Sequence, residues 1–269
     1  MFQSKWQSFG GLFATKYKTT GFKNVLQKLL GGNTFKNRWL PTVLVTHDLN
    51  SYEERLFSTT DASDYYAKDV AMATAAAPTY YKPQQVFPIG CHTSRGYFVS
   101  DGGTCMNNPV LAGIALLHKH YNASLEHIHV LSLGTGIADK LWTNEALQRG
   151  GALSWLGVMA KLCVEGPESA GDQAAQSYLG ARYYRFNPIL AHANLTLDDT
   201  SDENRAALLK ANAIMLADVD NAAKFDEVAI PLAANAKPVR IVEDTSPASI
   251  VIPERTFFQR AYDWFSKWF

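Results

Sequence analysis

A short apolar segment that runs into an aspartate on a glycine turn constrains the fold of this chain most. Residues 97–100, Tyr-Phe-Val-Ser, predict a strand, and the sequence D-G-G at 101–103 follows it directly. The sequence N-N-P at 107–109 then opens an apolar helix, with proline at the first helical position. In α/β sheets, binding and catalytic groups gather at the carboxyl ends of strands. Asp101 is therefore the candidate catalytic residue of the chain.

Predicted strands and helices alternate along the rest of the sequence. Apolar and β-branched runs predict strands at 42–46, 55–59, 97–100, 128–133 and 181–186. Helical spacing predicts helices at 17–30, 69–77, 109–118, 145–164, 168–179 and 202–219. The strand at 128–133 is expected to be buried, and Ser201 is expected to cap the last helix. The alternation predicts an α/β fold with a largely parallel sheet.

The composition excludes several classes of function. Lys plus Arg and Asp plus Glu both number 25, so no overall field attracts nucleic acid or an anionic bilayer. Cys91, Cys105 and Cys163 lack C-x-x-C spacing, which argues against a disulfide framework and a tetrahedral zinc site. No apolar run reaches the roughly 20 residues that cross a bilayer. The function must therefore come from a local site.

Two histidine pairs and one glycine loop offer alternative sites. His118 and His120 point to different faces of a predicted helix. His127 and His129 share a strand face without a third ligand nearby, so no metal site is predicted. The sequence S-L-G-T-G at 132–136 lacks the third glycine of a dinucleotide loop. It predicts a tight turn from strand to helix beside the active site.

Four motifs in a fixed order make the chain resemble the patatin-like phospholipase family. An Ala-rich helix ends in A-A-P-T-Y at 76–80, and D-G-G, N-N-P and S-L-G-T-G follow. Blocks at 183–186 and 197–204 extend the resemblance over about residues 10–220. An ordered set is more specific than any single motif. The resemblance implies a three-layer α/β/α patatin-like (lysophospholipase-like) sheet, which lacks its N-terminal strands here, in a domain at 1–230.

The resemblance also implies hydrolysis of lipid acyl esters by a Ser-Asp dyad without a cofactor. In the family, the serine of G-x-S-x-G attacks the ester and the aspartate of D-G-G takes its proton. Asp101 corresponds to that base, and a partly desolvated carboxylate has a raised proton affinity. Gly102 and Gly103 are expected because a Cβ would crowd the nucleophile or the turn. The residues expected to line the site are Pro78, Asn107, Asn108, Gly134 and Gly136.

The chain departs from the family pattern at the nucleophile. The 269 residues contain no G-x-S-x-G and no glycine-rich oxyanion loop, and Ser154 comes nearest, inside a predicted helix. About 20 residues precede the first helix, too few for two βα units. We expect the chain to be inactive alone. Three explanations stay open: a fragment, half of a split enzyme with a separate N-terminal half, or a non-catalytic relative that binds lipid or protein.

The C-terminal extension, 231–269, ends in the amphipathic aromatic run Phe257–Phe269. A helix of about 13 residues is too short to cross a bilayer but can lie in its interface. Trp264 and Trp268 suit the headgroup boundary. Peripheral membrane contact and packing on the domain or a partner are the two alternatives. A cytoplasmic or peripheral membrane location is slightly favoured over export, although an export signal would lie upstream of these residues.

Overall fold

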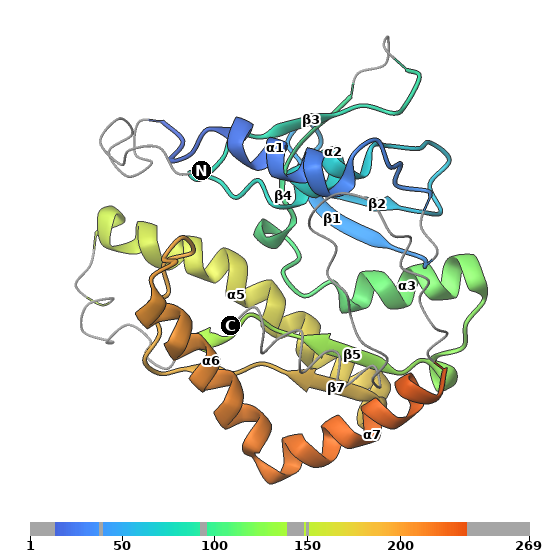
Figure 1. The fold of residues 1–269 in the computed structure, drawn as a ribbon, viewed down its shortest axis with the longest axis vertical. Helices are drawn as coiled ribbons and strands as arrows, with labels where there is room; N and C mark the ends of the chain where they lie inside the picture. The colour runs from blue at the N-terminus through green and yellow to red at the C-terminus, as the bar shows by residue number, and fades with distance from the viewer. Residues whose placement is uncertain (1–13, 38–39, 92–95, 139–147, 149–150, 236–269) are drawn as a thin grey trace. The chain divides into compact units, whose positions relative to one another are not determined.

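The computed structural model describes residues 14–37, 40–91, 96–138, 148 and 151–235, which form two compact units (Figure 1). The first unit takes its described residues from 1–128 and 145–180, and the second from 129–144 and 181–269. Helices occur with both antiparallel and parallel strand pairs, which confirms the α/β class. Among the described helices, none combines the length and the apolar character that a membrane crossing requires.

A four-stranded antiparallel sheet forms the centre of the first unit. Its strand order is β2-β1-β4-β3. The strands are β1 (Val43–Asp48), β2 (Glu53–Ser58), β3 (Gln84–Val86) and β4 (Tyr97–Asp101). The prediction of a largely parallel sheet is wrong here, because the four residues 49–52 return β1 directly into β2. A connection this short leaves no room for the crossover that parallel strands need.

Helix α2 (Ala67–Thr74) packs against β1, β3 and β4, and α1 (Thr19–Leu30) packs against α2 (Figure 1). Val70 and Ala73 of α2 are completely buried. The core cluster around them comprises Phe35, Phe57, Tyr65, Ala67, Val86 and Val99. The core therefore fixes the strand that ends at Asp101.

Two further helices complete the first unit. Helix α3 (Val110–Tyr121) begins one residue after Pro109, close to the predicted start. Helix α5 (Ala152–Leu179) is a single helix that continues through Pro167, where the sequence predicts two helices. A proline inside a helix removes one backbone hydrogen bond, and helical turns continue on both sides of Pro167. Ser154 lies inside α5, as expected.

Parallel strand pairs and two helices form the second unit. Strand β5 (Val130–Leu133) pairs with β7 (Tyr183–Phe186), and β6 (Ile137–Ala138) pairs with β8 (Ile189–Leu190), both in parallel. Helix α6 (Asp202–Ala217) begins at Ser201, whose Oγ accepts from the Asn204 N–H at 3.2 Å, as predicted. Helix α7 (Val219–Asn235) covers β7 through the Phe186 and Phe225 rings.

The predicted burial of β5 is wrong for most of the strand. Ser132 is 5% exposed, whereas Leu131 and Leu133 are 42% and 71% exposed. Successive side chains of a strand point to opposite faces, so only the face that carries Ser132 is covered. The aromatic run Phe257–Phe269 lies outside the described residues, and its amphipathic helix stays a prediction.

Candidate active site

Asp101 is the last residue of β4, and both its backbone and its side chain are held in place. Its N–H donates to the carbonyl oxygen of Ala76 at 3.2 Å. Its Oδ1 accepts from the N–H of Gly103 at 2.9 Å, and Thr104 Oγ1 donates to its carbonyl oxygen at 2.6 Å. The 3₁₀ turn η2 (Gly102–Thr104) therefore closes on the aspartate that precedes it. The carboxylate has one orientation relative to the strand.

Burial raises the pKa of the Asp101 carboxyl above its ordinary value. The hydrogen bond from the Gly103 N–H acts in the opposite direction but does not cancel this effect. Burial penalises the charged form, whereas a donor that points at the carboxylate stabilises it. The ionised carboxylate consequently binds a proton more tightly than an exposed aspartate does, which suits a general base.

Both glycines of the turn have close neighbours, and the contact at Gly102 excludes a side chain. A Cβ on Gly102 would overlap the carbonyl oxygen of Val45 on β1. A Cβ on Gly103 would lie 3.2 Å from Asn107 Oδ1 and 3.5 Å from Asp101 Oδ1. The sequence predicts crowding of the turn, and the structure adds that the neighbouring strand excludes a side chain at Gly102.

The N-N-P segment connects this turn to helices α3 and α5. Asn107 Nδ2 donates to Glu168 Oε2 on α5 at 2.5 Å. Asn108 is 5% exposed, and its Oδ1 accepts from the N–H of Val110 at the start of α3, at 3.3 Å. Glu168 is missing from the predicted site because it lies 61 positions from Asn107. The sequence shows only that Glu168 and Gly171 share one face of a helix.

The A-A-P-T-Y loop reaches Asp101 through its backbone. The Ala76 carbonyl oxygen bonds the Asp101 N–H, and Pro78 is exposed two residues further on. Thr79 has a φ of 69°, which is unfavourable for a β-branched residue. The Lys16 N–H donates to the Thr79 carbonyl oxygen at 2.8 Å and holds this conformation. The loop is therefore fixed between β4 and the segment that precedes α1.

Gly134 and Gly136 belong to the second unit, where Asn187 organises their loop. The Gly136 N–H donates to Asn187 Oδ1 at 2.7 Å, and a Cβ on Gly134 would overlap the same side chain. The prediction of a turn into a helix is wrong, because the Ile137 N–H bonds the Pro188 carbonyl oxygen and starts β6. The place of both glycines in the active site stays a prediction.

Cys105 is close to Asp101 but is unsuited to act as a nucleophile. Burial raises the pKa of its thiol to about 11, with further contributions from the negative charges of Glu54 and Asp101. The thiolate is the reactive form, and it is scarce at neutral pH when the pKa is this high. Within the part of the chain that the structure describes, no side-chain hydroxyl hydrogen-bonds the Asp101 carboxylate.

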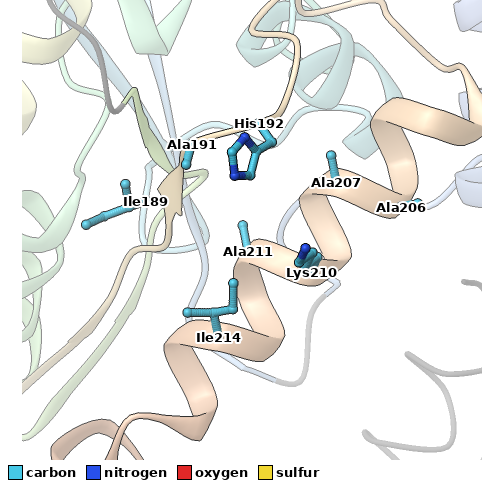
Figure 2. A pocket seen from close by; sticks show the side chains of 8 residues that line it. All are labelled: Ile189, Ala191, His192, Ala206, Ala207, Lys210, Ala211 and Ile214. Atoms are coloured by element: carbon cyan, nitrogen blue, oxygen red, sulfur yellow. The ribbon is translucent and has the colours of Figure 1, made fainter.

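A separate groove of about 270 Å³ lies between β8 and α6 in the second unit (Figure 2). Figure 2 shows Ala207, Ala211 and Ile214 of α6 across the space from Ile189 and His192. Its lining is aliphatic apart from His192 and Lys210. The groove has no carboxylate and no hydroxyl in its lining.

Over the described ranges, no cluster of three His, Cys, Asp or Glu side chains is arranged to hold a metal ion.

Comparison with known proteins supports the resemblance to the patatin-like phospholipases. Residues 3–114 match the family model described as patatin-like phospholipase. Patatin-2-Kuras 3 of Solanum tuberosum is 25% identical over 238 residues, which cover 78% of this chain and 61% of the relative. A cGAMP-activated phospholipase of Pseudomonas aeruginosa is 30% identical over 192 residues, covering 66% of this chain and 53% of the relative.

A cGAMP-activated phospholipase of Escherichia coli is 26% identical over 149 residues, which cover 50% of this chain and 40% of the relative. The chain spans 61% of the length of the patatin relative and less of both phospholipases. The family match and the similarity over most of the chain confirm the resemblance that the motifs indicate. Residues 3–114 thus resemble the patatin-like phospholipase family, and a patatin relative aligns with 78% of the chain.

Proposed function

We propose that Asp101 is the general base of a lipid acyl hydrolase whose serine nucleophile lies outside these 269 residues. The observation that carries the proposal is a partly buried carboxylate with a raised pKa at the end of a strand, followed by a glycine, Gly102, at which a neighbouring strand excludes a side chain. The same chain has no G-x-S-x-G. The chain alone is then inactive, and a segment that supplies the serine completes the site.

The chemistry assigns separate tasks to the two oxygens of the carboxylate. Oδ1 is held by the Gly103 N–H, and Oδ2 receives the proton of the serine hydroxyl. The serine oxygen forms a bond to the ester carbonyl carbon, and the resulting tetrahedral intermediate expels the alcohol, which takes its proton from Asp101. Water then attacks the acyl-serine ester and gives one proton to Asp101. As the tetrahedral intermediate releases the fatty acid, Asp101 returns this proton to the departing serine oxygen, which restores the serine hydroxyl and the carboxylate.

The substrate class follows from the family. Patatin-like phospholipases act on lipids, and the two bacterial relatives are named phospholipases. We therefore assign lipid acyl esters as substrates, with the segments that contain Pro78, Asn107 and Asn108 lining the site. Gly134 and Gly136 are assigned to the same site on the strength of their motif. No cofactor is needed, because the proton transfer and the acyl transfer use protein groups alone.

The test compares the chain alone with the chain joined to a segment that carries G-x-S-x-G, taken from the reading frame upstream of Met1. Phospholipid hydrolysis by the chain alone should equal background, and the joined protein should be active. Asp101→Asn should abolish the restored activity, whereas Asp220→Asn, at an exposed position of α7, should leave it unchanged. Hydrolysis by the chain alone that a serine-directed phosphonate blocks would contradict the proposal.

A non-catalytic relative that binds lipid or protein is the alternative, and the absence of G-x-S-x-G favours it. The aromatic run Phe257–Phe269 would then provide a membrane contact. Cosedimentation of the chain with liposomes, with and without residues 257–269, tests this contact. Tight binding that requires the run, together with an inactive joined protein, would favour the alternative over the enzyme.

A further inference from the structure

We propose that Glu168 is a positioning residue for Asp101: it holds Asn107, and through Asn107 it fixes the D-G-G turn that presents the carboxylate. The inference rests on the proposed role of Asp101 as a base. Glu168 belongs to α5, whereas Asp101 ends β4, so only the fold brings their neighbourhoods together.

The link is a chain of three contacts. Asn107 Nδ2 donates to Glu168 Oε2 at 2.5 Å. The Oδ1 atom of the same amide lies against Gly103, only 3.2 Å from the place that a Cβ would occupy. The Gly103 N–H in turn donates to Asp101 Oδ1 at 2.9 Å. One amide side chain therefore touches both the helix and the residue whose N–H orients the carboxylate.

Helix α5 packs closely against the N-N-P segment that contains Asn107. A Cβ on Gly171, one turn after Glu168, would lie 3.6 Å from the carbonyl oxygen of Asn108, so the helix approaches the N-N-P backbone closely. A hydrogen bond to an ionised acceptor is about twice as strong as a neutral one. Loss of the Glu168 acceptor would leave the Asn107 amide without this partner beside the turn, at the cost of its desolvation.

Two modes of action of Glu168 predict opposite changes in the pKa of Asp101. A negative charge nearby raises a carboxyl pKa, so a purely electrostatic role means that removal of the Glu168 charge lowers the pKa of Asp101. If Glu168 instead maintains the Gly103 N–H bond, its loss raises that pKa. The other charged or titratable side chains on the turn and on β1 and β2 are Cys105, His47 and Asp48 on β1, and Glu53, Glu54 and Arg55 on β2.

The experiment follows the Asp101 carboxyl by ¹³C NMR as a function of pH in the 269-residue chain, with Asp101→Asn for assignment. Glu168→Ala should raise the pKa of Asp101. Glu168→Gln, which keeps an acceptor oxygen but no charge, should leave it near the wild-type value. Ser169→Ala, at the exposed neighbouring position of α5, is the matched control and should change nothing. A lower pKa in both Glu168 variants, or reduced thermal stability without any change of the pKa, would overturn the proposal.

A double-mutant cycle tests whether Glu168 acts on Asp101 through Asn107. Asn107→Ala should raise the pKa of Asp101 as Glu168→Ala does, and the two changes together should have no larger effect than either alone. If Glu168→Ala does not fold, the pKa of Asp101 in Asn107→Ala and Glu168→Gln still tests whether Glu168 positions Asp101. An Asp101 pKa that stays unchanged in Asn107→Ala contradicts the link.

The titration needs no catalysis, so its outcome is independent of the proposed function. In the joined protein described above, Glu168→Ala should lower kcat on the order of tenfold with KM unchanged, because the base is misplaced while the lipid still binds. Full activity of Asp101→Asn in the joined protein would refute the proposed function. A pKa of Asp101 that does not respond to Glu168→Ala would refute the positioning role alone.

Discussion

At the scale of single residues, the turn at Asp101 depends on the lack of a side chain at Gly102 and Gly103. The backbone of β1 occupies the space beside Gly102, and Asn107 occupies the space beside Gly103. The D-G-G motif thus has a steric reason within the sheet, independent of any nucleophile. The motif itself is visible in the sequence, but the identity of the group that excludes each side chain is not.

Gly102→Ala should destabilise the first unit strongly, because its Cβ would overlap the backbone carbonyl of Val45 and one of the two strands must move. We expect a loss of about 3 kcal/mol in the free energy of unfolding, measured by urea denaturation. Gly113→Ala is the control, since a Cβ there meets no atom within 4 Å on α3. That variant should be neutral or up to about 1 kcal/mol more stable. Equal effects of the two variants would contradict this account.

Asp101→Asn should change stability in a pH-dependent way. Burial raises the folded-state pKa of Asp101 above its unfolded value, so this group contributes stability fully below the unfolded pKa and loses it as pH rises through the folded pKa. Asparagine keeps the acceptor for the Gly103 N–H but carries no charge. The variant should therefore gain stability relative to the wild type between pH 4 and pH 7, measured by thermal unfolding. A constant difference across this range would be inconsistent with the raised pKa.

At the scale of elements, the local sequence pattern predicts whether a segment is a helix or a strand. It does not predict which strand pairs with which, or whether the pair is parallel or antiparallel. The segments at β1, β2, β4, β7 and α6 agree with the predicted strands and helix. The antiparallel direction of β1 and β2 depends on a four-residue connection, and the continuity of α5 depends on tolerance of Pro167. Strands as short as β3, β6 and β8 exist because a neighbouring strand pairs with them, so their own sequence predicts them poorly.

The loop between β5 and β6 offers a test at this scale. Asn187→Ala removes the acceptor of the Gly136 N–H and should destabilise the second unit by about 1 kcal/mol. The Gly136 amide should also exchange faster with deuterium, because Gly136 has a φ of 106° and depends on this bond for its conformation. Asn212→Ala, at an exposed position of α6, serves as the control and should affect neither measurement. Unchanged exchange at Gly136 would show that Asn187 does not hold the loop.

At the scale of the whole molecule, charge balance and exposed apolar side chains act together. The formal net charge is zero at pH 7. Large apolar side chains such as Leu133, Leu197 and Val219 are more than two thirds exposed. Without net charge, little repulsion keeps such surfaces apart. We therefore expect overall composition and exposed surface to govern the colloidal behaviour of the chain.

The solubility of the 269-residue chain should consequently pass through a minimum near pH 7. It should rise on either side, at about pH 5.5 and pH 8.5, as net charge of either sign accumulates. Precipitation by polyethylene glycol over this pH range measures the effect. Added salt should weaken the gain at both ends, because it screens the repulsion. Solubility that is flat with pH would show that contacts other than apolar association dominate.

The sequence by itself determines the resemblance to the patatin-like phospholipases, the α/β class and the position of Asp101 at the end of a strand, because these depend on ordered local motifs. It also determines that no G-x-S-x-G is present among these residues. Only the tertiary structure decides that β1 excludes a side chain at Gly102, that Glu168 bonds Asn107, and that Asn187 holds the Gly136 loop. These contacts join residues that are 51 to 61 positions apart in the sequence, and no local pattern encodes them. Burial, which sets the pKa of Asp101, is likewise a property of the packed chain.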